Sequence, residues 1–173
     1  MTPASMESPL GDSTHTTPTL FRRMACWLYE GMLLFGVIFI AGYLFSTLSQ
    51  SRHGLSNRFG LQAFVVLVLA IYFTWFWHKG QTLAMKTWRI RVLDRHGAAL
   101  TQALALKRFA LSWLWFAPPL ILAWLLGLPA LTSLACTGVW VVLWAGSARL
   151  APGGQFWHDV WAGTQLIHEP IPD

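Results

Sequence analysis

Glu30 is a carboxylate inside an apolar stretch that runs from residue 24 to residue 48. A charge at that depth in a bilayer is costly unless it is paired, protonated or hydrated, so Glu30 is predicted to face other helices or a polar cavity. Arg23 lies two helical turns earlier on nearly the same face, directly after Arg22. One hypothesis is a salt bridge that locks the helices together. The other is a group that exchanges protons or binds a cation on a transport path.

Asp159 is the second carboxylate of interest, because His158 precedes it. The two could belong to a metal site or form an acid–base pair, but no third ligand or nucleophile is near them in the sequence. The alternative is a carboxylate that begins a helix or pairs with a basic residue at the membrane face. The sequence therefore predicts no enzyme, no metal and no cofactor. Cys26 and Cys136 lie in apolar stretches and are predicted to be small packing residues.

Basic residues gather in the segment from 78 to 107, the one extended polar segment between apolar stretches. Its glycine has no P-loop pattern around it, so no phosphate-binding loop is predicted. The net charge of +5 could indicate nucleic acid. Because the basic residues flank apolar stretches, anionic lipid at the cytoplasmic face explains them better. We take the following residues of the segment as supporting the charged cluster: Gly80, Gln81, Thr82, Lys86 and Arg91.

The composition places these residues in a membrane. Hydrophobic residues make up 55% of the 173 residues and charged residues 11%, whereas soluble domains have about 25% charged residues. So few charges cannot cover the surface of a soluble chain of this size. Four apolar stretches are long enough to cross a bilayer, and they lie at roughly 24–48, 61–77, 105–126 and 129–148. The predicted fold is an all-α membrane bundle of about four transmembrane helices.

The segments around these stretches complete the prediction. Residues 1–20 are rich in Ser, Thr and Pro and are expected to be a disordered tail, with a transmembrane domain from 21 to 168 and a second tail from 169 to 173. Pro118 and Pro119 should kink the third span. Residues 88–93 alternate in polarity, and a turn at 94–97 predicts a small cytoplasmic β-hairpin over 89–100. A strand at 163–168 is expected to pair with it, after an interfacial segment at 156–161.

The basic residues also predict the orientation in the membrane. With four spans, Arg22, Arg23, the 78–108 segment and Arg149 share one side, and the opposite side has Arg52 and Arg58. Cytoplasmic loops carry the excess of Lys and Arg. Both termini are therefore predicted to be cytoplasmic.

Three motifs in order along the chain resemble the RDD family of bacterial membrane proteins. The first is Arg-Arg-Met-Ala at 22–25 with an acidic residue seven positions after Arg23. The second is His-Lys-Gly-Gln-Thr-Leu-Ala-Met-Lys at 78–86, which leads into Ile-Arg-Val-Leu-Asp at 90–94. The third is Gln-Phe-Trp-His-Asp at 155–159, followed by Ala-Gly-Thr at 162–164. The resemblance covers roughly residues 20 to 168.

The family takes its name from one arginine and two aspartates. By position, the resemblance implies that the arginine is Arg23 or its neighbour Arg22, that the first acid is Glu30 and that the second is Asp159. Glu30 departs from the family pattern, which has Asp there, and Ala84 replaces a usual Gly. A salt bridge tolerates the longer side chain of Glu, whereas a tight ion site is more sensitive to it.

The resemblance implies a multi-pass protein of the bacterial plasma membrane and an activity in transport, of which cation/proton exchange is one form. In that hypothesis Arg23, Glu30 and Asp159 form a polar cluster near the cytoplasmic face, with Lys86 and Arg91 close to it. The alternative is a module without transport, in which the cluster is a structural staple and the basic surface binds anionic lipid or a partner protein. Four short spans leave little room for an internal path, so transport would favour a homo-oligomer or a membrane-protein partner.

Overall fold

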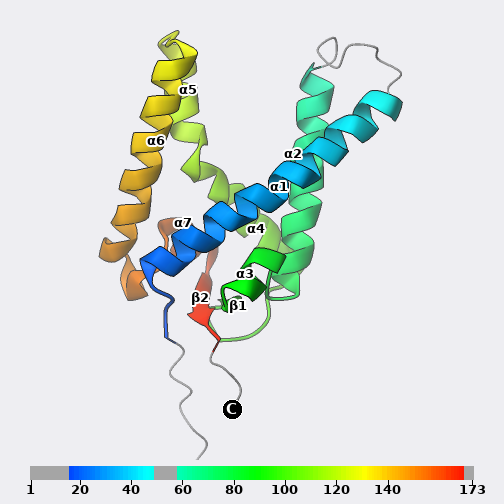
Figure 1. The fold of residues 1–173 in the computed structure, drawn as a ribbon. Helices are drawn as coiled ribbons and strands as arrows, with labels where there is room; N and C mark the ends of the chain where they lie inside the picture. The colour runs from blue at the N-terminus through cyan, green and yellow to red at the C-terminus, as the bar shows by residue number, and fades with distance from the viewer. Residues whose placement is uncertain (1–15, 49–57, 170–173) are drawn as a thin grey trace, which may run out of the picture.

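The computed structural model describes residues 16–48 and 58–169 of the chain. Most of the tail expected at 1–20 therefore lies outside the described residues, as do Arg52 and residues 170–173. Residues 16–19 have no regular secondary structure, and helix α1 begins directly after them (Leu20–Leu48). Figure 1 shows α1 running obliquely across the other long helices.

Three described helices are long and apolar enough to cross a membrane, and a bent pair makes a fourth candidate. The three are α1, α2 (Arg58–His78) and α6 (Ala130–Ser147). The pair consists of α4 (Gln102–Ser112) with the short helix η1 (Trp113–Trp115), followed by α5 (Ala117–Leu125), and its two parts are bent by 46°. The mostly helical, membrane-type architecture expected from the composition is confirmed.

The bend lies at Phe116, beside the prolines that predicted it. Pro118 and Pro119 lie in the first turn of α5, where a missing backbone N–H costs least. Phe116 leaves helical geometry with φ −128° and closes η1 by donating its N–H to the carbonyl of Trp113. The chain therefore ends one helix and begins another at this point, as the predicted kink required.

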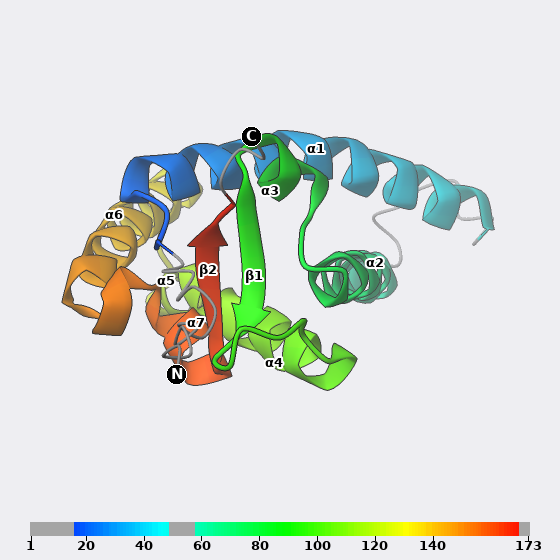
Figure 2. The ribbon, with the colours of Figure 1, turned by 90° about the horizontal axis from the view of Figure 1, so that it is seen from below.

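A small antiparallel sheet lies at one end of the helices. Strand β1 (Ile90–Asp94) pairs with β2 (Thr164–His168), with Ile90 opposite His168 and Asp94 opposite Thr164. Figure 2 shows the sheet between α1 on one side and α4 on the other. Ile90, Val92 and Leu166 are buried and join the hydrophobic core beneath the helices. The expected pairing of residues 163–168 with the segment around residue 90 is confirmed.

The hairpin expected over 89–100 is wrong in its second half. Asp94 forms the turn, because its side chain accepts from the backbone N–H groups of His96 and Ala98 at 2.8 Å. The chain after the turn forms no strand and enters α4, which Thr101 caps. One edge of β1 is taken by β2, and on the other edge Val92 donates its N–H to the carbonyl of Gly80 at 2.9 Å. On that same edge the only backbone bond from β1 to the chain after the turn, among the described residues, runs from the N–H of Asp94 to the carbonyl of Ala98 at 2.9 Å, so the local pairing ends at the turn.

Short elements connect the sheet to the bundle. Helix α3 (Leu83–Thr87) precedes β1, the short helices η2 (Ala148–Leu150) and η3 (Pro152–Gly154) follow α6, and α7 (Trp157–Ala162) precedes β2. The amide of Gln155 exchanges two hydrogen bonds with the backbone of Leu166, at 2.9 and 3.0 Å. The N–H of His168 donates to the carbonyl of Thr16 at 2.9 Å. The described start and end of the chain thus meet at the sheet.

Candidate functional site

Glu30 is buried in α1 and is held by hydroxyl groups rather than by a cation. The hydroxyl of Tyr72 on α2 donates to its Oε1 at 2.7 Å. The hydroxyl of Thr82, the residue that caps α3, donates to its Oε2. The salt bridge expected between Glu30 and Arg23 or Arg22 does not form. Two O–H donors satisfy the carboxylate instead and join α1 to α2 and α3.

Arg23, the arginine of the first motif that turns inward, is 7% exposed. Its guanidinium lies over the ring of Phe156, 4.5 Å from the ring centroid, in a cation–π contact. Its Nε and Nη1 atoms are buried and have no hydrogen-bond partner among the described residues. Arg22 turns away from this site, and its Nη1 lies 2.7 Å from Nδ1 of His168 on β2.

Asp159 is fully buried and pairs with Arg108, a residue that the sequence did not single out. Nε of Arg108 lies 2.7 Å from Oδ1 of Asp159. Arg108 is 5% exposed, and its guanidinium also lies over the ring of Trp77, 4.1 Å from the centroid. The pair joins α4 to α7. Neither Arg22 nor Arg23 of the first motif forms an ion pair with Asp159 of the third. The sequence signal that could have identified Arg108 is its position, directly after the basic segment and before a stretch without charges.

His158 lies in an aromatic environment that keeps its ring neutral. Nε1 of Trp115 donates to its Nδ1 at 3.2 Å, and its Nε2 lies 3.4 Å from Oδ1 of Asp159. The ring of Phe156 stacks on it at a centroid distance of 5.5 Å. Burial lowers the pKa of His158 to about 4, against the opposing effect of the Asp159 charge. The pKa of Asp159 is also lowered: burial alone would raise it, and the charge of Arg108 reverses the direction.

The residues of the 80–91 segment split between structural contacts and the surface. Gly80 has φ +93°, and a Cβ there would lie 3.0 Å from Nε of Arg91. Gln81 donates its amide to the carbonyl of Ile90 and to Glu169. Arg91 pairs with Glu169 at 3.5 Å, and both side chains are partly exposed. Lys86 is exposed. Among the described residues Lys86 and Arg91 form no ion pair with Glu30 or Asp159, whereas Thr82 contacts Glu30 directly.

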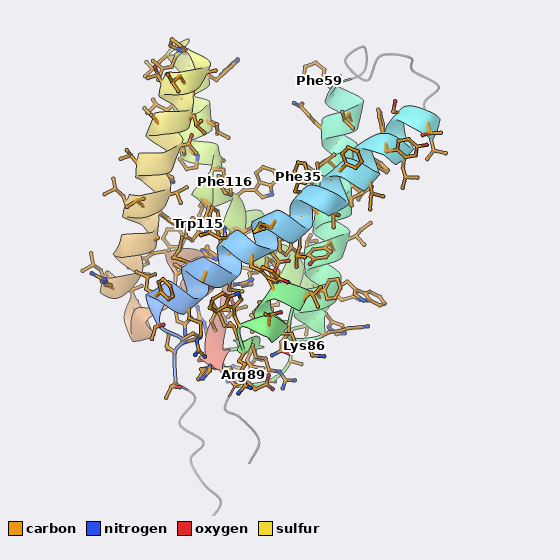
Figure 3. The ribbon with its side chains drawn as sticks, in the orientation of Figure 1. Phe35, Phe59, Lys86, Arg89, Trp115 and Phe116 are labelled. Atoms are coloured by element: carbon orange, nitrogen blue, oxygen red, sulfur yellow. The ribbon has the colours of Figure 1, made fainter. Side chains whose placement is uncertain are left out.

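The buried charged groups line one cavity of about 800 Å³ between α1, α2 and α4. Ile90 of β1 and Leu166 of β2 contribute to its lining. Figure 3 shows Trp115 and Phe116, which also line it, beside α1 and far from Lys86 and Arg89 at the sheet end of the molecule. The charged members of the lining are Arg23, Glu30 and Arg108, and the neutral ring of His158 also lines it. The cavity thus combines ionisable groups with a largely apolar wall inside the helical bundle.

Among the residues that the structure describes, no three His, Cys, Asp or Glu side chains are grouped as metal ligands would be. Cys26 is buried and Cys136 is exposed, and both are free thiols.

The sequence model of the RDD family matches residues 17–163, which is most of the chain. No curated protein and no solved structure matches this chain significantly.

Proposed function

This chain belongs to the RDD family, and from that premise we propose that it is a small membrane transporter whose ligand site is the cavity between α1, α2 and α4. Glu30 is the group that exchanges a proton with a cation or with another ligand. The observation that carries the proposal is the position of Glu30 on the wall of an 800 Å³ cavity, with no cationic partner among the described residues.

The partners of Glu30 suit a group that changes its protonation state. A hydroxyl both donates and accepts hydrogen bonds. The hydroxyls of Tyr72 and Thr82 can donate to an ionised Glu30 and can turn to accept from a protonated one. A fixed arginine partner would favour the ionised state alone. The surroundings of Glu30 therefore support proton exchange better than the expected salt bridge would have done.

Glu30→Gln tests this function. Proteoliposomes that contain the purified protein should move protons in response to a sodium or potassium gradient. Gln cannot exchange a proton, so the variant is expected to lose this flux, whereas Glu30→Asp should keep part of it. Glu169→Gln, at the partly exposed ion pair with Arg91, is the matched control and should leave the flux unchanged. Absence of flux from the folded wild-type protein with every cation tried contradicts the proposal.

A second candidate function is a module without transport, in which these contacts are a staple and the exposed basic surface around Lys86 and Arg89 binds anionic lipid or a partner protein. The bonds from Tyr72 and Thr82 to Glu30 favour it, because they join three helices.

The candidate without transport makes a specific prediction for Thr82→Val. Thr82 both caps α3, by accepting from the N–H of Met85, and donates to Glu30. Its loss should lower the free energy of unfolding by about 2–3 kcal/mol, as the sum of a cap and a hydrogen bond to a charged group. Thr101→Val removes only the cap of α4 and should cost about 1 kcal/mol. Equal losses in denaturant titrations would remove the support for a staple at Glu30.

We propose further that both termini are cytoplasmic and that the chain crosses the membrane four times. Two contacts support an even number of crossings both before β1 and between β1 and β2. The N–H of His168, after α6, donates to the carbonyl of Thr16, before α1. Strand β1, between α2 and α4, pairs with β2, after α6. These contacts support placing the three segments on one side. A periplasm-dependent reporter fused after Asp173 should be inactive, and strong activity there would rule out this orientation.

A further inference from the structure

The cavity combines charged and apolar lining residues. Arg23, Glu30 and Arg108 line it together with Ile90 and Leu166 of the sheet. The lining also includes Leu28, Met32 and Phe35 of α1, which are 62%, 73% and 73% exposed on the outside of the helices. An opening bordered by such residues leads into hydrocarbon rather than into water. A ligand with one charged end and one apolar end matches this combination of charged and apolar lining residues.

Arg23 is the charged group of this cavity whose hydrogen bonds are left unmade. Arg108 is neutralised by Asp159 at 2.7 Å. Glu30 already accepts from two hydroxyls. Nε and Nη1 of Arg23 are buried without a hydrogen-bond partner among the described residues, and its guanidinium lies over the ring of Phe156. Buried donors without partners cost free energy, and a guanidinium donates charge-assisted hydrogen bonds to carboxylate and phosphate oxygens. The unmet chemistry of the cavity is therefore that of an anion.

We propose that this cavity binds a single-chain lipid acid, an amphiphile with one acyl chain and a carboxylate or phosphate headgroup, which enters from the bilayer and places its headgroup at Arg23. The proposal goes beyond transport, because such a ligand can occupy the site whether or not Glu30 supports a flux.

The size of the cavity favours one chain. A volume of about 800 Å³ lies in the range of about 300–1,000 Å³ that sites for one small ligand occupy. The apolar wall separates this ligand from a free anion, which would gain nothing from Leu28, Met32 or Phe35. The apolar wall thus distinguishes the lipid acid from inorganic phosphate, and Arg23 distinguishes it from an uncharged lipid.

Binding of dodecyl phosphate to the purified protein in detergent tests the proposal, with dodecanol and inorganic phosphate as comparisons. Dodecyl phosphate should bind at least tenfold more tightly than either. Arg23→Gln should weaken its binding at least tenfold and leave the binding of dodecanol unchanged. Arg22→Gln, one residue away and directed to His168, should change it less than twofold. Equal binding of dodecanol, equal binding of inorganic phosphate, or equal weakening by Arg22→Gln would each overturn the proposal.

A pair of glycines tests the apolar part of the site without touching a charge. Gly31 lines the cavity, and a Cβ added there meets nothing within 4 Å, so Gly31→Phe should fold and fill the cavity. Gly36 lies on the same helix, has the same free space and is absent from the lining, so Gly36→Phe is its control. Gly31→Phe should weaken dodecyl phosphate binding at least tenfold and Gly36→Phe less than twofold. Unchanged binding by Gly31→Phe contradicts the proposal even if Arg23→Gln does not fold.

Discussion

Replacing Asp159 with Asn is expected to lower the free energy of unfolding by about 3–5 kcal/mol, because it leaves the buried guanidinium of Arg108 without a counter-charge. Arg108 is 5% exposed and Asp159 is fully buried, so water cannot replace the lost partner. Asn keeps the shape of Asp, which confines the change to charge and hydrogen bonding. Denaturant titration of the protein in detergent micelles measures the loss.

Two comparisons make this expectation specific to burial. Glu169→Gln breaks the Arg91–Glu169 pair, whose side chains are 43% and 44% exposed, and should cost less than about 1 kcal/mol. Combining Asp159→Asn with Arg108→Met removes both charges and should recover a large part of the loss. If Asp159→Asn costs no more than Glu169→Gln, or if the double variant is less stable than Asp159→Asn, the buried pair does not have the role assigned to it.

The stability of the protein should fall as the pH is lowered from about 6.5 to about 4, the window between the unfolded and folded pKa values of His158. Burial depresses the folded pKa to about 4, so in this window the unfolded chain binds a proton that the folded protein does not. Protons therefore favour the unfolded state, and the loss across the window is about 3 kcal/mol. Below it the depressed pKa of Asp159 extends the loss, because its charge stabilises the fold only while it is ionised.

His158→Gln should flatten the slope of unfolding free energy against pH between about 4 and 6.5. The slope is the quantity to compare, because the substitution also removes the contact with Trp115 and shifts stability at every pH. His96→Gln, at an exposed position in the turn after β1, should leave the slope as it is in the wild type. A slope that survives in His158→Gln would assign the pH dependence to another group.

The helices could be predicted from the sequence because a long apolar stretch has few alternatives in a bilayer. Residues 24–48 were expected to be a span, and α1 covers them. The spans expected at 105–126 and 129–148 were separated correctly, because Gly127, with φ +60°, lies in the break between α5 and α6. The sheet was harder, because the turn at 94–97 is genuine while the partner of β1 comes from 70 residues later. The residues of a turn do not indicate which distant strand pairs with β1.

The residues of the charged cluster were partly identifiable and their pairing was not. Burial of Glu30, Arg23 and Asp159 follows from placing charges among apolar segments. Which cation meets which carboxylate depends on how helices are rotated, and one helical position turns a side chain by about 100°. Arg23 and Glu30 were expected to pair along one helix, yet Glu30 faces Thr82 and Tyr72 on other elements. Arg108 was overlooked because no motif marks the partner of Asp159.

Three contacts at the sheet end join early parts of the chain to late ones, and this has a consequence for biogenesis. Arg108 needs Asp159, Arg22 needs His168, and β1 needs β2, so none of these partners exists while the first helices enter the membrane. Insertion and closure of the sheet are separate events in the life of each chain. A chain with one helix inserted the wrong way would leave β1 and β2 on opposite faces of the bilayer, unable to meet. The sheet can therefore close only in a chain whose β1 and β2 lie on the same face, and any other chain keeps an unpaired strand and unmatched charges.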